Sequence, residues 1–358
     1  MPELRPFRAE DVHEVGRLHR KVWPPSRGVT SEMEDEYSAW LRDVYLEHPW
    51  QHPQLRSLVA ERDGRIVGFI GVVPRPIKLA GNSLMAAVSS QLIVGPEGHK
   101  ALAGVHLIRE FLRGPQDLSI ADEANDASRK IWEMVGGATC SIASVGWIHV
   151  LRPTGYLAYR LAGRKRLRTI RAFRGLSGPL DTGLGALRRS PQAPATVTTE
   201  LMSTVELHAW LEDDAWSGRV RPRYELEALE WLLSRAGGRQ GQLRQRAVRG
   251  ANGRTLGCYL YRMGDDRIAE VVLLQAHRGR HDAVFTSLLC DAHDTGALAL
   301  SGRLSPGLIG PVASARSQFL STPQWSLFHS TSDAISRQLH DGTALLSRLD
   351  GEYPLRLR

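Results

Sequence analysis

Short apolar runs dominate the N-terminal part of this chain, and their spacing predicts β-strands. Two of these runs flank Asp63-Gly64, a dipeptide that favours a tight hairpin turn. After the first run, an amphipathic helix is expected to place Val12, Val15 and Leu18 on one face. The pattern therefore predicts an antiparallel meander with a helix packed against it. The strands are expected at 4–7, 57–61, 65–71 and 83–94.

After Val94 the pattern changes to alternating helices and strands. A turn containing Gly and Pro follows the strand, and an amphipathic helix then runs to Gly114-Pro115, which ends it. A short strand at 117–121 comes next, and a second helix covers 125–137. The order strand, turn, helix, strand, helix is the part of the sequence on which the functional interpretation depends.

The second half of the chain repeats this order in outline. Asn252-Gly253 marks another hairpin turn, and a strand at 268–274 leads into a basic turn at 277–282. A helix that ends at Gly296 and a short strand at 297–300 follow. We therefore expect two tandem domains. Their predicted bounds are 1–160 and 199–358, with a basic linker rich in Gly and Pro at 161–198.

Composition narrows the class of protein. The 358 residues are enough for about two domains at ~150 residues each, and 42% hydrophobic with 23% charged residues is typical of soluble globular proteins. The sequence has no run of ~18 apolar residues and no apolar signal core at its start, so no membrane span is expected. The cysteines Cys140, Cys258 and Cys290 lack the spacing of a metal site or a disulfide framework. These features predict a cytoplasmic protein without a metal.

Charge does not select a ligand. The formal net charge is +8, which attracts anions. Coenzyme A, nucleic acid and anionic lipid are all polyanions, so each is compatible with that charge.

The stretch 92–137 resembles the acyl-CoA-binding half of the GCN5-related N-acetyltransferases, the GNAT superfamily. In that family the helix after the second strand carries Asn, a small residue three positions on, Tyr seven on and Gly eleven on. Asn125, Ser128, Trp132 and Gly136 occupy those positions here. The resemblance implies an α/β (α+β) fold of two tandem GNAT-like domains, each a mixed, mostly antiparallel sheet flanked by helices.

The resemblance also implies that the donor is acetyl-CoA or another acyl-CoA. Its pyrophosphate is expected at the start of the helix after Val94, where unpaired backbone N–H groups and the helix dipole favour anions. Gly104 matches the family's turn, whereas Leu102 stands where a glycine is usual and Lys100 would compensate by charge. The expected cofactor-binding residues are Ile93, Val94, His99, Lys100, Ala101, Leu102, Ala103, Gly104, Asn125, Ser128 and Trp132.

Two of these residues also have simpler explanations. Asn125 precedes a helix, where asparagine is a good N-cap, and one residue can both cap the helix and bind the cofactor. Trp132 is expected to pack either against the cofactor or in the core, with the core favoured. The family's tyrosine can protonate the leaving thiolate, but an indole N–H is too weak an acid to do so, so another group or water must act.

Direct acyl transfer needs a base for the attacking amine and hydrogen-bond donors for the thioester oxygen. The candidate bases are Asp122 and Glu123, which follow the second strand, and Glu270 within a strand of the second half. Acids before the first turn of a helix are common for structural reasons alone. A second candidate phosphate-binding turn contains Arg278, Arg280 and His281.

The polar and aromatic segment 24–56 offers candidate lining for an acceptor cleft. An amphipathic helix with exposed acids is the simpler interpretation. The candidates are Glu34, Glu36, Tyr37, Trp40 and Tyr45.

The resemblance implies an acyltransferase that moves an acyl group, acetyl in the simplest case, from acyl-CoA to an amine of a small molecule or peptide. Neither a membrane nor a metal is expected to take part. Two alternatives remain open. An aminoacyl transferase similar to the Fem peptidyltransferases would use aminoacyl-tRNA, and the basic linker suits that partner. A non-catalytic GNAT-like binding or scaffold protein would account for Leu102 and Trp132.

Overall fold

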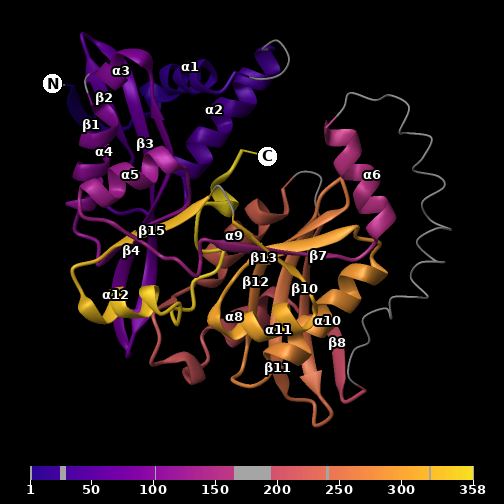
Figure 1. Ribbon diagram of the computed structural model, residues 1–358. Coiled ribbons are helices and arrows are strands. Elements are labelled where there is room, and N and C mark those ends of the chain that lie inside the picture. Colours follow the sequence, from indigo (N-terminus) through magenta and orange to yellow (C-terminus); the bar gives the residue numbers. More distant parts are fainter. Residues whose placement is uncertain are drawn as a thin grey trace. The chain divides into compact units, whose positions relative to one another are not determined.

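The computed structural model describes residues 2–24, 30–100, 102–164, 195–238, 242–321 and 324–357. Its helices and strands form two compact units (Figure 1). The first contains Met1–Ser144, His208–Leu232 and Pro323–Arg358, and the second contains Val145–Leu207 and Leu233–Thr322. The units therefore interleave along the chain, whereas the sequence pattern placed contiguous domains at 1–160 and 199–358. A local pattern carries no information on which distant strands pair, and most of the predicted linker at 161–198 lies outside the described residues.

The first unit is built on a mixed sheet that has eight strands among the described residues. Neighbouring strands pair antiparallel except for β4 and β5, which run parallel. This confirms the predicted fold class, a mostly antiparallel sheet flanked by helices. The strand order is β1 (Glu3–Pro6), β2 (Leu58–Arg62), β3 (Arg65–Leu79), β4 (Asn82–Val94), β5 (Leu118–Ala124), β15 (Trp325–His329) and β6 (Ala138–Thr139), with β9 (Arg221–Pro222) paired to β3.

Two tight turns set the register of the meander. Asp63 and Gly64 connect β2 to β3 with φ angles of 52° and 70°, the positive pair that matches the right-handed twist of a hairpin. Ala80 and Gly81 connect β3 to β4 with φ angles of 50° and 82°. The first of these turns lies at Asp63-Gly64, where the sequence predicted it.

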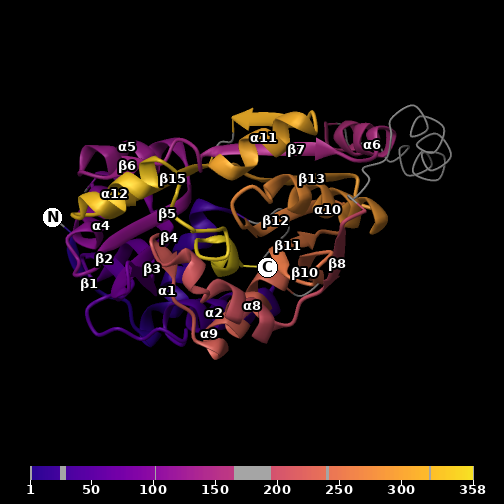
Figure 2. The ribbon, with the colours of Figure 1, turned by 90° about the horizontal axis from the view of Figure 1, so that it is seen from below.

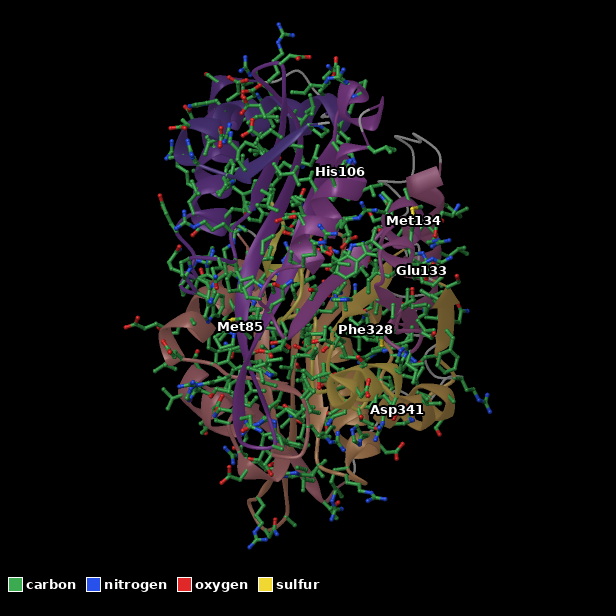
Figure 3. The ribbon with its side chains drawn as sticks, turned by 90° about the vertical axis from the view of Figure 1, so that its left-hand side faces the viewer. Met85, His106, Glu133, Met134, Phe328 and Asp341 are labelled. Carbon is green, nitrogen blue, oxygen red and sulfur yellow. The ribbon has the colours of Figure 1, made fainter. Side chains whose placement is uncertain are left out.

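Helices cover both faces of this sheet (Figure 2). On the face of α4, the side chains of Leu107, Ile108 and Phe111 are buried in one cluster with Ile70 and Val72 of β3. Figure 3 views this side of the unit, with His106 on α4 and Glu133 on α5 labelled. One face carries α1 (Val12–Val22) and α2 (Ser31–Tyr45), and the other carries α4 (Ala103–Leu112), α5 (Asp126–Met134) and α12 (Asp333–His340). The short helix α3 (Pro96–Lys100) precedes α4 in the chain.

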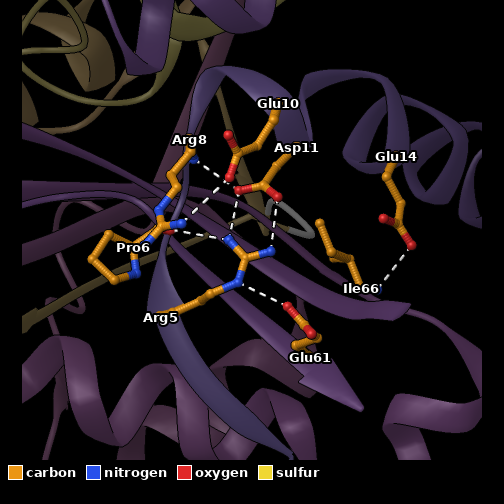
Figure 4. A network of polar contacts seen from close by, with 8 residues as sticks. All are labelled: Arg5, Pro6, Arg8, Glu10, Asp11, Glu14, Glu61 and Ile66. Carbon is orange, nitrogen blue, oxygen red and sulfur yellow. Dashed lines mark hydrogen bonds and ion pairs between the residues drawn. The ribbon is translucent and has the colours of Figure 1, made fainter. Parts of the chain in front are cut away.

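Ion pairs and hydrogen bonds connect β1 and β3 to α1 and to Asp11, the N-cap residue of α1 (Figure 4). The Arg5 guanidinium donates to both carboxylate oxygens of Asp11, at 2.7 and 2.8 Å, and its Nε donates to Glu61 at 2.8 Å. Burial opposes ionisation of Asp11, but the hydrogen bonds from Arg5 and from the Arg8 backbone outweigh it and hold the pKa of Asp11 below its ordinary value. Glu14 of α1 accepts from the backbone N–H of Ile66 at 2.9 Å, which ties the helix to β3.

Replacing Arg5 by methionine is expected to lower the free energy of unfolding by about 2 kcal/mol, because buried Asp11 keeps its charge and loses two charge-assisted hydrogen bonds. Since the folded pKa of Asp11 is depressed, the loss applies above its unfolded value of about 3.9 and shrinks as pH falls further. Urea denaturation at pH 7 measures it. Arg62→Met is the control, because the Arg62 side chain is 49% exposed. Equal losses in both variants would refute this account.

The second unit contains a sheet of seven strands within the described part of the chain. Neighbours are antiparallel except for the parallel pair β12–β13. Trp147 and Phe285 both lie in its core, and their ring centroids lie 5.2 Å apart. The order is β14 (Gln318–Ser321), β7 (Val145–Val150), β13 (Ala299–Arg303), β12 (Ile268–Ala276), β11 (Thr255–Met263), β10 (Gln242–Gly250) and β8 (Val197–Leu201). The helices of this unit include α6 (Pro153–Arg164), α10 (His281–Asp294) and α11 (Ile309–Ser314), and the division between the units falls within α8 (Thr204–Leu211) and α9 (Leu226–Gly237).

Candidate active site

The sheet of the first unit opens between its two parallel strands. The parallel register pairs Ala86 with Leu118 and extends only to Val88 with Ile120. Beyond that point β5 pairs with β15 on its other side, while β4 stays paired with β3. The C-terminal ends of β4 and β5 therefore separate at the middle of the sheet.

A β-bulge lies in β4 at the same level. Ser90 pairs with Gly71 and Ile93 pairs with Phe69, so Gln91 and Leu92 together face one residue of β3. Gln91 has a φ angle of 53°, in the left-handed region. Such bulges interrupt the hydrogen-bond ladder and redirect side chains, and they are common beside active sites.

A cavity of about 290 Å³, named here the splay cavity, occupies the opening between β4 and β5. Residues from α1, β3, β4, α4, β5, α5 and the C-terminal segment line it, and polar groups come from the bulge, the start of α5, α1, β5 and the C-terminal segment. The lining residues are His19, Trp23, Ile70, Ser89, Ser90, Gln91, Leu92, Ile108, Ala121, Glu123, Ala124, Asn125, Ser128, Trp132, Gln324 and Glu352.

Three of the predicted cofactor-binding residues, Asn125, Ser128 and Trp132, line this cavity. The Asn125 Oδ1 accepts from the Ser128 backbone N–H at 2.9 Å, so Asn125 is the N-cap of α5 as well as part of the cavity wall. Trp132 is 2% exposed and its ring centroid lies 5.9 Å from that of Phe111. It is therefore a core residue with one edge at the cavity.

The predicted phosphate turn lies at the junction of α3 and α4. Leu102 is the N-cap of α4 in a left-handed conformation, with its side chain 60% exposed. Its carbonyl accepts from the backbone N–H groups of Val105 and His106, at 3.0 and 3.1 Å. A Cβ at Gly104 would lie 3.3 Å from Val94, so glycine allows α4 to approach β4 closely.

The remaining predicted cofactor-binding residues lie either in the core or outside the described part of the chain. Ile93 and Ala103 are buried, and Val94 is partly buried against the core of the α4 face. Ala101 and the side chains of His99 and Lys100 lie outside the described part of the chain.

The three predicted bases have different surroundings. Glu123 lines the cavity, and its carboxylate accepts from the guanidinium groups of Arg356 and Arg348, the latter at 3.5 Å. Asp122 is buried against the C-terminal segment, where its Oδ1 accepts from the Glu352 backbone N–H at 2.6 Å. Glu270 lies on β12 of the second unit, paired with Arg262 and Ser301 in the sheet register.

The sequence analysis missed Glu352. One carboxylate oxygen of Glu352 accepts from the backbone N–H groups of Asp122 and Glu123, at 3.1 and 3.0 Å, and the side chain lines the splay cavity. The turn before it is anchored by Asp350, which is buried and accepts from the Tyr224 hydroxyl and the Ser347 backbone. No local pattern marks residues so far apart in the sequence as neighbours.

His19 was not predicted from the sequence as a residue of the site. Its Nε2 lies 3.1 Å from the Gln91 Oε1, so α1 is connected to the β4 bulge. Burial lowers the pKa of His19 to about 4, although the hydrogen bond with Gln91 partly opposes this. At neutral pH the imidazole is therefore uncharged. It adds no positive charge to a cavity lined by the carboxylates of Glu123 and Glu352.

The sheet of the second unit also has one parallel pair of strands, β12 and β13, but different residues lie near the end of this pair. Its parallel strands pair from Ile268–Ala299 to Glu270–Ser301, and β12 is irregular beyond that point. The predicted phosphate turn at 277–282 includes His281. The His281 ring packs against the backbone of Gly307, so a Cβ at Gly307 would overlap the imidazole. The short 3₁₀ turn Pro306–Leu308 therefore covers the start of α10.

Solved structures share this architecture. The chain is similar to a conserved protein of unknown function from Enterococcus faecalis V583, described as a probable N-acyltransferase, with 11% identity, 94% of this chain and 74% of that chain covered, and a TM-score of 0.56. A GCN5-related N-acetyltransferase from Kribbella flavida has 14% identity, coverage of 94% and 73%, and a TM-score of 0.52. One from Anabaena variabilis ATCC 29413 has 11% identity, coverage of 93% and 73%, and a TM-score of 0.58.

These likenesses define the class of fold. The protein has the GNAT fold in two tandem GNAT-like units, which confirms at the level of the fold the resemblance seen at 92–137. No protein-family model matches the sequence, and a search of the curated proteins finds no match.

The described residues contain no group of three or more His, Cys, Asp or Glu side chains placed to hold a metal ion. No described helix combines the length and the apolar character needed to cross a bilayer.

Proposed function

We propose that this protein is an N-acyltransferase that moves an acyl group from acyl-CoA to a primary amine in the splay cavity of the first unit. The observation that carries the proposal is the position of that cavity. It lies where β4 and β5 separate, beside a bulge in β4 and beside the N-cap of α5. The shared fold supports the same reaction class.

The helices on the α4 face suit the anionic end of the donor. The side chain of Leu102, the N-cap residue, makes no cap hydrogen bond to α4, and a helix N-terminus offers N–H groups and a favourable dipole to phosphate. The Leu102 side chain, expected from the sequence to crowd the pyrophosphate, is mainly exposed. Asn125 and Ser128 would then contact the pantetheine arm between the strands.

The carboxylates of Glu123 and Glu352, which line the splay cavity, suit a cationic acceptor. We assign Glu352 the role of binding the ammonium group and accepting its proton, and Glu123 a supporting role, because two guanidinium groups already hold its carboxylate. The amine nitrogen attacks the thioester carbon, a C–N bond forms, and the C–S bond breaks. The thiolate takes a proton from water or from a group other than Trp132. Asp122 supports Glu352 through the C-terminal segment.

Calorimetry with acetyl-CoA and thiol release with a panel of primary amines test the proposal. Asn125→Ala is expected to raise the KM for acyl-CoA about tenfold, which is the effect of losing one good hydrogen bond to the donor. Loss of the cap alone lowers stability by about 1 kcal/mol. Thr30→Ala is the matched control, because Thr30 caps α2 through the Met33 N–H at 3.3 Å.

The outcomes distinguish the proposed function from its alternatives. Equal KM values in the Asn125 and Thr30 variants would remove Asn125 from the donor site. Absence of binding and transfer for every acyl-CoA would contradict the proposed function. In that case, tRNA binding with a steep salt dependence would favour the aminoacyl-transfer alternative.

A further inference from the structure

A second cavity lies in the first unit, on the other side of Tyr45 from the splay cavity. Its volume is about 340 Å³, and it is named here the side cavity. Tyr45 and Phe7 form part of its wall together with the segment that follows α2. The lining residues are Phe7, Tyr45, Leu46, His48, Gln51, His52, Pro53, Leu55, Arg56 and Ser57.

The Tyr45 side chain spans the distance between the two cavities. Its ring lines the side cavity, and its hydroxyl lies 2.8 Å from the Oγ of Ser90, a buried residue that lines the splay cavity. The hydrogen bond is itself buried. The Tyr45 side chain and its contact with Ser90, named here the partition, therefore connect the lining of the side cavity to that of the splay cavity.

Packing fixes the partition in place. The Tyr45 ring makes edge-to-face contacts with Phe69 and Trp40, with centroids 5.4 and 5.8 Å apart. The ring lies directly over Gly71, where any Cβ would overlap it. Gly71 pairs with Ser90 across the sheet, so the absent side chain at Gly71 is what allows the hydroxyl to reach Ser90.

The reacting end of the donor lies beside this partition. Under the proposed function, the thioester sits between the ends of β4 and β5 at the level of the bulge, which begins next to Ser90. An acyl group that extends past the bulge on the α2 face meets the Tyr45 hydroxyl. On the far side of the ring, the apolar residues Phe7, Leu46 and Leu55 line the wall.

We propose that Tyr45 sets the length of the acyl group that the enzyme transfers. With Tyr45 in place the splay cavity takes a short acyl group, and without its ring the side cavity receives a longer chain. The inference rests on the proposed function. The bonds formed and broken are unchanged, since only the part of the acyl group remote from the thioester enters the side cavity.

The test compares acetyl-, butyryl- and hexanoyl-CoA as donors with one fixed amine. Tyr45→Ala and Tyr45→Leu are expected to raise the ratio of kcat/KM for hexanoyl-CoA to that for acetyl-CoA by at least about tenfold, since one methylene in an apolar pocket changes kcat/KM by that order. Tyr45→Phe removes the hydroxyl and keeps the ring, so its chain-length preference should remain that of the wild type. Tyr45→Leu keeps part of the packing if Tyr45→Ala unfolds.

The outcomes are distinct. An unchanged chain-length preference in a folded Tyr45→Leu variant would overturn the inference and leave the acyltransferase activity standing. If the wild type binds and transfers no acyl group, the proposed function fails, and the partition is judged by crystals of Tyr45→Leu under xenon. Xenon in one continuous space from Ser90 to Leu55 would support the partition, whereas two separate sites would refute it.

Discussion

Glu352→Gln is expected to lower kcat/KM for the acceptor amine by about two to four orders of magnitude, the usual contribution of a general base. The substitution removes the charge and the proton-accepting oxygen from the cavity. It retains the amide oxygen that accepts from the backbone N–H groups of Asp122 and Glu123, so the C-terminal segment should stay in place. The affinity for acyl-CoA should be unchanged.

Steady-state kinetics with the amine varied, together with calorimetry for the donor, measure this effect. Glu10→Gln is the control, because its side chain is 70% exposed and undergoes the same chemical change. A fall in donor affinity that accounts for the lost rate would assign Glu352 to structure rather than to catalysis. Full activity in Glu352→Gln would transfer the role of base to Glu123 or to a water molecule.

Acidification from pH 7 to pH 4 is expected to lower the free energy of unfolding through two histidines, the buried His48 and the partly buried His19. Burial lowers the pKa of both His19 and His48 from 6.5 to about 4, and the Arg75 guanidinium adds to the effect at His48. Between these values the unfolded chain binds protons that the folded protein does not, so stability rises with pH. At 1.36 kcal/mol for each pH unit, the loss is about 3 kcal/mol for His48. For His19, whose ring borders the cavity, solvent screening reduces it to about 2 kcal/mol.

Urea denaturation of His48→Gln and His19→Gln across this range measures the two contributions. Each variant should show a smaller fall in stability between pH 6.5 and pH 4 than the wild type. Between pH 7 and pH 8, where neither imidazole changes charge, the three proteins should respond alike. A variant with the full wild-type fall would show that its histidine titrates normally in the folded state.

Local sequence signals predicted the elements whose causes are local. Asp63-Gly64 fixes a hairpin through its backbone angles, and Asn125 starts a helix through a hydrogen bond three residues on. The pairing of β15 with β5 was beyond such signals, since Trp325 and Ala124 are far apart in the chain. For the same reason Glu352 could not be predicted as a residue that lines the splay cavity. Glu123 was predicted from its position after a strand, but its engagement by Arg356 depends on a segment that returns from the end of the sequence.

The pairing of β15 between β5 and β6 also bears on how the protein is made. The ribosome synthesises β1 to β5 before the second unit, yet their sheet is completed by residues 324–357, which follow the second unit in the sequence. Domains generally fold as units in the order of synthesis. Here the first unit must wait with an exposed strand edge until the second unit has been synthesised, so a nascent chain stalled before Trp325 is a natural client for chaperones.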